Sequence, residues 1–422
     1  MTDKKYKLTI SILASNRRET LPKTLKSIKP ILDNVSSELI VTDTGCDDEL
    51  LGVIKGYTDK LIEFAWCNDF AKARNVGLKQ AQGEWFMFLD DDEWFEDVKP
   101  IIEFFNSGEA DKYNQFYYIQ RNYHDKSGGS WQDSYVDRGI RLCGDIEFVD
   151  VIHEHYSRRL NPIRLIAAYV HHYGYVYETE EARRKHCERN LALLEKQMSE
   201  GDYSQRMYIH MLQEYDTLGE HGRAYDVALQ GIEKAKLSGR ADRRMLSSIK
   251  VNSIYSLFRL KRDNELIEKA KQYLSEGGLT LSAYCAINAY LVYAYREAGA
   301  LDGVIEATLE YFSIRKLLEH NRTQRDYDSL LATGLVYSGT IPNGIYNMGL
   351  MSAVERGDEV AAVAIMRNVV YVDSLTQPDE ADWLLKLTRL LAVSKDKAEL
   401  AGAMSAYISR LKESGEQMNT NI

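Results

Sequence analysis

The sequence has few cysteines, no excess of basic residues and no long apolar stretch. The 5 cysteines are an odd number, lie far apart and form no Cys-x-x-Cys pair, which favours a reducing compartment over a disulfide framework. With 53 Lys and Arg against 63 Asp and Glu, the formal net charge is -10. Nucleic acid is therefore not an expected partner, because phosphate binding needs a clustered basic surface. No apolar run is long enough to form a transmembrane segment, and the N-terminus lacks the pattern of a secretory signal. We expect a cytoplasmic protein. If its substrate is membrane-bound, we expect it to act at the inner face of the membrane.

The N-terminal part alternates β-branched runs with helical patterns, which is typical of βαβ units and a parallel sheet. The predicted strands are 8–14, 38–42, 61–66 and 85–89, and the predicted helices are 20–32 and 69–80. Aromatic, β-branched segments then continue to about Gly174 and predict hairpins packed against the sheet. We therefore predict an α/β domain over residues 1–177.

After Glu178 the strand signals nearly vanish, and an all-α domain is predicted over 178–422. Turns near Gly219, Lys261 and Gly299 recur at roughly forty residues, a period that indicates stacked helical hairpins. The segment MYIHMLQEYDTLGEHGRAYDVALQGI resembles a tetratricopeptide repeat at its packing positions, which are Leu212, Tyr215, Gly219, Ala224, Tyr225 and Ala228. The alternative is an irregular helical bundle. Such a domain would bind an acceptor or, through Tyr-rich helices, form a homodimer.

Three consecutive carboxylates follow the predicted strand 85–89: Asp90, Asp91 and Asp92. Crowded like charges raise one another's pKa unless a cation neutralises them. Because alternate residues of an extended segment face the same way, Asp90 and Asp92 would present oxygen ligands to Mg²⁺ or Mn²⁺, whereas Asp91 faces elsewhere. Open α/β sheets bind ligands at the carboxyl ends of their strands, where this cluster lies. A solvated acidic turn is the alternative.

The stretch WCNDFAKARNVGLKQAQGEWFMFLDDDEWF resembles the central signature of family 2 glycosyltransferases, whose nucleotide-binding domain has the GT-A fold. The residues that match this pattern are Asp69, Arg74, Asn75, Gly83 and the Asp90-x-Asp92 pair. Ser15-Asn16-Arg17 with Glu19, and Asp43 after the second strand, look like the nucleoside-binding loops of the family. The resemblance implies a Rossmann-like GT-A domain that uses a nucleotide sugar, most often a UDP-sugar, as donor.

We therefore expect the donor to be bound by one set of polar residues: Ser11, Asn16, Glu19, Asp43, Asp69, Arg74, Asn75, Asp90 and Asp91. Asp43 would accept hydrogen bonds from the base or the ribose. Arg74 carries a forked, permanently charged guanidinium that suits a diphosphate.

A second constellation lies in the segments IHEHY and YVHHYGY, which contain His153, Glu154, His155, His171 and His172. The family resemblance implies that the later histidine is a third metal ligand. We assign this role to His172, beside Asp90 and Asp92, and expect His171 to face the other side of its strand as a satisfied sheet histidine.

An inverting transfer needs a carboxylate that takes the proton of the acceptor. Glu154 is the first choice, with Asp150 and Asp137 as rivals. The flanking histidines would instead allow Glu154 an acceptor-binding or supporting role.

The combined prediction is a metal-dependent inverting glycosyltransferase that acts on a peptide or protein. The resemblance favours this acceptor because helical repeats hold peptides and family members with such appendages include enzymes that glycosylate peptides. A cell-surface polysaccharide or glycolipid is the alternative acceptor. Two other classes remain open: a binding or assembly module with a vestigial GT-A unit, and a nucleotidyltransferase. The absence of a Gly-rich loop after the first strand counts against the second.

Overall fold

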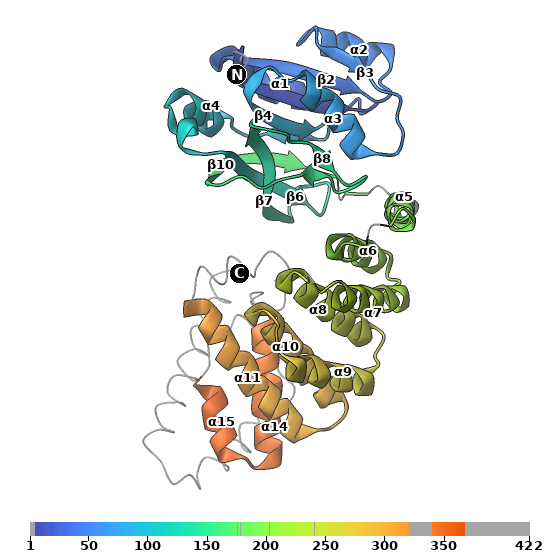
Figure 1. Ribbon diagram of the computed structural model, residues 1–422. Coiled ribbons are helices and arrows are strands. Elements are labelled where there is room, and N and C mark those ends of the chain that lie inside the picture. Colours follow the sequence, from blue (N-terminus) through green and yellow to red (C-terminus); the bar gives the residue numbers. More distant parts are fainter. Residues whose placement is uncertain are drawn as a thin grey trace. The chain divides into compact units, whose positions relative to one another are not determined.

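The computed structural model describes residues 5–320, except 175, 178, 202 and 240, and residues 340–367. The chain forms two compact units, Met1–Gly201 and Asp202–Ile422, which are treated separately below (Figure 1). The sequence places the domain boundary at 177/178, close to where the strands end. Helix α5 (Glu180–Ser199) nevertheless belongs to the first unit. Predictions for residues after 367 lie outside the described residues.

The described part of the N-terminal unit contains an eight-stranded mixed sheet with the strand order β3-β2-β1-β4-β7-β6-β10-β5. Strands β1 to β4 are parallel, β7 is antiparallel to both of its neighbours, and β10 is parallel to β6. The strands are β1 Tyr6–Ala14, β2 Ser37–Asp43, β3 Leu61–Glu63, β4 Gly83–Asp90, β5 Glu93–Phe95, β6 Gln115–Tyr123, β7 Trp131–Arg141 and β10 Ile163–His172. A separate hairpin pairs β8 (Phe148–Val149) with β9 (His155–Tyr156).

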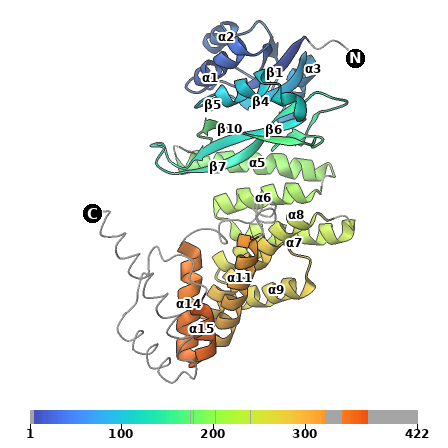
Figure 2. The same cartoon turned by 90° about the vertical axis from the view of Figure 1, so that its left-hand side faces the viewer.

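Helices cover both faces of this sheet, because the buried strands are apolar on both sides. One core joins β1 and β4 to helices α1 (Leu21–Asn34), α2 (Asp48–Lys55) and α4 (Lys99–Asn106). A smaller core on the other face joins Phe86 and Phe88 of β4 to helix α3 (Phe70–Gln80) and the β8–β9 hairpin (Figure 2). The predicted α/β fold class is confirmed.

The strand register brings the ends of three strands together. Ala14 at the end of β1 pairs with Asp43 at the end of β2, and Leu13 pairs with Asp90 at the end of β4. The loops that follow these strands therefore leave the sheet at one edge, as parallel pairing requires. This edge carries most of the residues that the sequence singles out.

The second unit is helical throughout its described part. Its helices are α6 Gln205–Leu218, α7 His221–Ser238, α8 Arg243–Arg259, α9 Asp263–Glu276, α10 Leu281–Glu297, α11 Leu301–His320, α14 Thr340–Arg356 and α15 Glu359–Met366. Ser204, Asp242 and Thr280 cap α6, α8 and α10 with their side chains.

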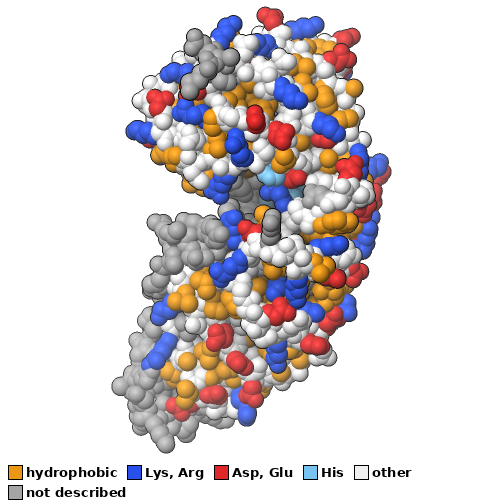
Figure 3. All heavy atoms as spheres, viewed as in Figure 1, with side chains coloured by type: hydrophobic (Ala, Val, Ile, Leu, Met, Phe, Trp, Pro, Cys, Tyr) orange, Lys and Arg blue, Asp and Glu red, His pale blue; other side chains and the backbone are white. Residues whose placement is uncertain are grey.

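The turns predicted near Gly219, Lys261 and Gly299 are present, and each of these residues has a positive φ. The tetratricopeptide assignment stays a prediction. None of the described helices is long and apolar enough to span a membrane. On the face shown in Figure 3, acidic and basic side chains are interspersed.

Gly83, at the start of β4, lies so close to β1 that a side chain has no room: a Cβ there would lie 2.7 Å from the carbonyl carbon of Leu8. Because backbone cannot move aside, we expect Gly83→Ala to lower the free energy of unfolding by about 3 kcal/mol. Gly52 is the matched control, since a Cβ there meets nothing within 4 Å and lies in helix α2. Gly52→Ala should be neutral or stabilise by up to about 1 kcal/mol. Urea unfolding of both variants checks this, and equal effects would contradict it.

Candidate functional site

The acidic turn after β4 does not follow the alternation that the sequence predicts. Strand β4 ends at Asp90, and the chain turns through Asp91 and Asp92 before β5 begins. Asp90 continues the face of Phe86 and Phe88 and meets helix α3, whereas both following carboxylates meet the loop after β1. Asp90 and Asp92 therefore do not share one face, because the period of two holds only while the strand continues.

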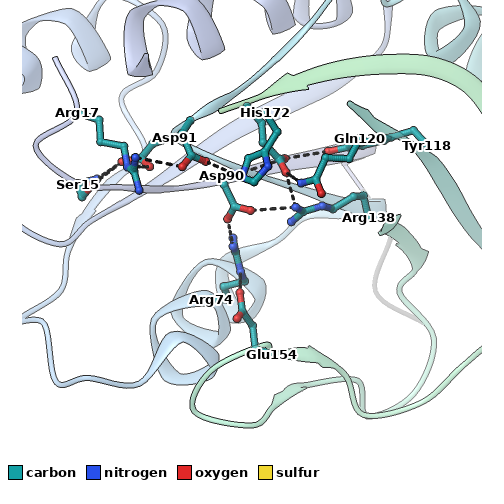
Figure 4. A network of polar contacts seen from close by, with 12 residues as sticks. Ser15, Arg17, Arg74, Asp90, Asp91, Tyr118, Gln120, Arg138, Glu154 and His172 are labelled. Atoms are coloured by element: carbon teal, nitrogen blue, oxygen red, sulfur yellow. Dashed lines mark hydrogen bonds and ion pairs between the residues drawn. The ribbon is translucent and has the colours of Figure 1, made fainter. Parts of the chain in front are cut away.

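Asp91 is anchored to the loop after β1. Its Oδ2 accepts hydrogen bonds from the backbone N of Ser15 at 2.6 Å and from Ser15 Oγ at 2.7 Å. Arg17 bridges the turn, with Nε 3.0 Å from Asp91 Oδ1 and Nη1 3.1 Å from Asp92 Oδ2 (Figure 4). Burial raises the pKa of Asp91 to about 6, although Arg17 opposes the shift. Asp91 is thus an integral part of the turn.

His172, at the end of β10, faces Asp92. His172 Nδ1 lies 2.7 Å from Asn122 Oδ1, and His172 Nε2 lies 3.9 Å from Asp92 Oδ1. Because an amide oxygen only accepts, Nδ1 carries the proton and Nε2 is left as an acceptor. Burial lowers the pKa of His172, which keeps the imidazole neutral at pH 7, the form that ligates metals.

Gly174 packs closely against these two side chains. A Cβ on this residue would lie 2.8 Å from His172 Cε1 and 3.4 Å from Asp92 Oδ2. The neutral nitrogen and the carboxylate are ligands of the kinds that divalent cations take. Within residues 5–320 and 340–367, however, no group of three or more His, Cys, Asp or Glu side chains is arranged to hold a metal. The predicted set of Asp90, Asp92 and His172 is therefore not assembled, since Asp90 is paired with arginines.

Arg74 occupies an interior position that the sequence does not predict. Only 4% of the residue is exposed, and its guanidinium donates to Asp90 from Nη2 and to Glu154 from Nε. Arg138 Nη2 contacts the other oxygen of Asp90 at 2.9 Å. Burial opposes ionisation of Asp90, but Arg74 and Arg138 together hold its pKa well below the usual range. In this structure the guanidinium of Arg74 therefore contacts protein carboxylates, and its expected contact with a diphosphate stays a prediction.

Three other residues predicted to bind the donor occupy structural positions. Ser11 is buried in β1, and its Oγ would lie 2.6 Å from a Cβ on Gly77 of α3. Asp69 caps helix α3 by accepting from Lys72 N at 2.8 Å. Asn75 holds strand β8, since it donates to Phe148 O at 2.9 Å and accepts from Phe148 N at 2.8 Å. Each of these three side chains therefore contacts a neighbouring part of the protein.

The remaining predicted donor residues lie in the loops at the sheet edge. Asp43 Oδ1 accepts from the backbone N atoms of Gly45 at 2.9 Å and Cys46 at 2.7 Å, which shapes the loop after β2. Asn16 Oδ1 accepts from Asp47 N at 3.3 Å. Asn16 and Glu19 are exposed. These residues are available at the same edge as Asp91 and Asp92.

The three candidate bases lie near the β8–β9 hairpin. Glu154 is paired with Arg74, as described above. Asp150 Oδ1 accepts from Gln197 Nε2 of helix α5 at 3.0 Å, and Asp150 Oδ2 lies 3.3 Å from His155 Nδ1. Asp137 of β7 accepts from Gln115 Nε2 at 2.6 Å, and burial raises its pKa to about 6.

His171 faces away from His172. Its Nδ1 lies 2.7 Å from Tyr123 Oη, and its ring stacks on that of Tyr123. This agrees with the expectation of a satisfied sheet histidine.

Four residues that the structure brings to this site have no role in the sequence analysis: Glu93, Asn122, Arg138 and Gly174. Glu93 and Arg138 are charged residues beside aromatic and β-branched ones, which was the available signal, because a charge is seldom buried without a partner. Which partner each one meets depends on the order of strands in the sheet, and no local pattern contains that order.

Residues 9–158 match the family model described as Glycosyl transferase family 2. The N-terminal unit therefore contains a family 2 glycosyltransferase domain. The SPbeta prophage-derived glycosyltransferase SunS of Bacillus subtilis is 26% identical over 204 residues, which are 45% of this chain and 45% of that protein.

A TPR repeat-containing protein of Synechococcus elongatus is 35% identical over 86 residues, 20% of each chain. The chain thus spans less than half the length of these curated relatives. A crystal structure of S. aureus TarS shares 13% identity and a TM-score of 0.36, covering 62% of this chain and 54% of its own.

Asp137 supplies a pH test of the site. Its pKa in the folded protein, about 6, lies above the ordinary value of 3.8, so between these values the unfolded chain loses the proton first and stability falls as the pH rises. Asp137→Asn removes this loss and should be more stable than the parent at pH 8 by up to about 3 kcal/mol. The advantage should vanish by pH 4. Urea unfolding at both pH values checks this, with Asp133→Asn of the same strand as control. An advantage that is equal at both pH values would refute it.

Proposed function

We propose that the protein transfers a monosaccharide, with inversion, from a nucleotide sugar to a peptide or protein, and that the donor is a UDP-sugar. The observation that carries the proposal is the position of the acidic turn. Asp91 and Asp92 lie at the carboxyl ends of β1 and β4, inside the segment that matches the family 2 model, and are tied to the loop after β1 by Ser15 and Arg17. Nucleotides bind open α/β sheets at this edge.

Asp92 and His172 are the residues that would hold a Mg²⁺ or Mn²⁺ ion, a narrower set than the sequence predicts. When bound, such a cation stabilises the charge of the departing nucleotide diphosphate. Asn122 fixes the His172 ring so that Nε2 faces Asp92. Arg17 has a side chain that is 50% exposed and lies beside the same carboxylate. Its forked guanidinium suits diphosphate oxygens, so we assign Arg17 the donor contact that the sequence gives to Arg74.

Glu154 is the proposed base that takes the proton of the acceptor hydroxyl or thiol. Its side chain is 11% exposed, and Arg74 fixes one of its oxygens. Asp150 remains a rival, but Gln197 and His155 already engage both of its oxygens. One oriented carboxylate is sufficient for this step.

The helical unit supports a peptide or protein acceptor. Successive helices pack against one another, as in repeat proteins that offer extended surfaces to peptides. A polysaccharide or glycolipid acceptor would not need such a surface.

The donor reaction is tested by UDP release from UDP-glucose, UDP-N-acetylglucosamine and UDP-galactose, each with Mn²⁺ or with EDTA. We expect release from one donor only when metal is present. Asp92→Asn should lower this rate by at least about 100-fold because it removes a charged ligand. Gly174→Ala should also weaken Mn²⁺ binding, measured by electron paramagnetic resonance with UDP and without turnover, because its methyl group would collide with the His172 ring and displace it from Asp92.

Asp145→Asn, an exposed residue after β7, is the control and should behave as the parent. Full release in EDTA would contradict the metal requirement. Silence with every donor would favour the binding module with a vestigial domain.

Glu154→Gln separates donor binding from transfer. We expect the affinity for UDP to stay within about threefold of the parent, whereas transfer to a peptide acceptor falls by about 10²- to 10⁴-fold because the base is lost. Calorimetry with UDP and mass spectrometry of the peptide measure the two effects. Near-normal transfer by this variant would move the base to Asp150 or Asp137, whose Asn variants decide between them.

A further inference from the structure

Five charged side chains form a continuous chain of alternating sign across the site. In order they are Glu154, Arg74, Asp90, Arg138 and Glu93. Figure 4 labels the first four. Asp90 joins the two arginines, since Arg74 contacts its Oδ1 and Arg138 its Oδ2. Arg138 Nη2 also lies 2.5 Å from Glu93 Oε1. This series of ion pairs therefore connects the β8–β9 hairpin, helix α3 and strands β4, β5 and β7.

The five side chains of this ion-pair series differ in how far they are exposed to solvent. Arg74 is 4% exposed, Arg138 is 7% exposed and Glu93 is fully buried. The side chain of Asp90 is 31% exposed, so it is the member that faces solvent most. The two arginines are thus enclosed by protein, and their available action on a substrate is to hold Asp90 and Glu154.

The ring of Phe88 packs against the guanidinium groups of both arginines. Each guanidinium carbon lies over the same ring, Arg74 at 4.4 Å and Arg138 at 4.5 Å from its centroid. Phe88 stands two residues before Asp90 on the same face of β4, so the ring and the carboxylate present one site to both cations. A planar guanidinium can stack and donate in two directions at once, which a lysine ammonium cannot.

The loop before Glu154 needs support from outside itself. Asp150 and His153 both have positive φ angles, 73° and 56°, which residues with a side chain seldom adopt. The backbone N of Phe70, at the start of α3, donates to Val151 O at 2.8 Å. Arg74, one turn further along the same helix, holds Glu154. Helix α3 therefore supports the loop at two points.

We propose that Arg74 is a positioning residue that holds Glu154 in register with the acidic turn, and that Arg138 secures the shared carboxylate Asp90 from the other side. This inference rests on the proposed function, because it assigns Glu154 the role of base. It also replaces the donor-binding role that the sequence gives to Arg74. One helix residue thereby sets the separation between the donor side and the acceptor side of the site.

Arg74→Lys tests the proposal, since it keeps the charge but cannot reach both carboxylates with directed bonds. We expect kcat to fall by about 100-fold, the loss that a misplaced catalytic group causes. The donor KM should change by less than about threefold. Arg121→Lys is the matched control, because Arg121 also bridges two carboxylates, Asp133 of β7 and Glu96 just after β5. A large rise in donor KM for Arg74→Lys would overturn the proposal in favour of direct donor binding.

A double-mutant cycle with Glu154→Gln identifies the route by which Arg74 acts. If Arg74 works by placing Glu154, Arg74→Lys should lower kcat by less than about threefold once Glu154 is already Gln. A further loss of about 100-fold in that background would show that Arg74 acts elsewhere and would refute the proposal.

Hydrogen exchange of residues 149–156 gives a readout that needs no turnover. We expect Arg74→Lys to speed exchange there at least about tenfold, while the β1–β4 strands stay protected and Arg121→Lys changes nothing. Unchanged exchange would refute the positioning role. If the parent protein releases UDP from no donor yet Arg74→Lys still loosens this loop, the proposed function fails while the structural coupling stands.

Discussion

Charges removed from water must be paired, and this requirement determines the arrangement of the site. The turn after β4 places three carboxylates in succession, and each finds its partner on a different element. Asp90 is paired from helix α3 and strand β7, Asp91 from the loop after β1, and Asp92 from that loop and from strand β10. A single turn thus ties together segments that lie far apart in the sequence, because each unpaired carboxylate would carry a large desolvation penalty.

The fold of the N-terminal unit could be predicted from the sequence because its signals are local. The strand predicted at 85–89 is found as Gly83–Asp90, and the helix predicted at 69–80 as Phe70–Gln80. Apolar runs and caps specify such elements without knowledge of their neighbours. The strand predicted at 61–66 shortens to Leu61–Glu63, since it pairs only with the last residues of β2 at the edge of the sheet.

The site could be predicted only in part, because its geometry depends on contacts between distant segments. The family signature contains Arg74 and Asp92, a separate His-rich segment supplies Glu154, and the structure brings all three close to the acidic turn. The signature did not reveal that Arg74 points inward, because that depends on the carboxylates opposite it. The expectation that alternate residues face the same way also failed at the acidic turn, because strand β4 ends at Asp90. Local patterns indicate which residues carry the chemistry, whereas strand order decides what each one contacts.

The exposure of each arginine then separates two kinds of role. Arg17 is half-exposed, so it can exchange the carboxylates of the turn for the oxygens of a ligand at little cost in desolvation. Arg74 is almost fully enclosed, and breaking a buried pair by removing one partner costs about 3–5 kcal/mol, which makes exchange unfavourable. Within the proposed function we therefore assign diphosphate recognition to the loop after β1 and alignment to the interior. The acidic segment contributes to both, because Asp91 and Asp92 contact the loop after β1, whereas Asp90 contacts helix α3 and strand β7.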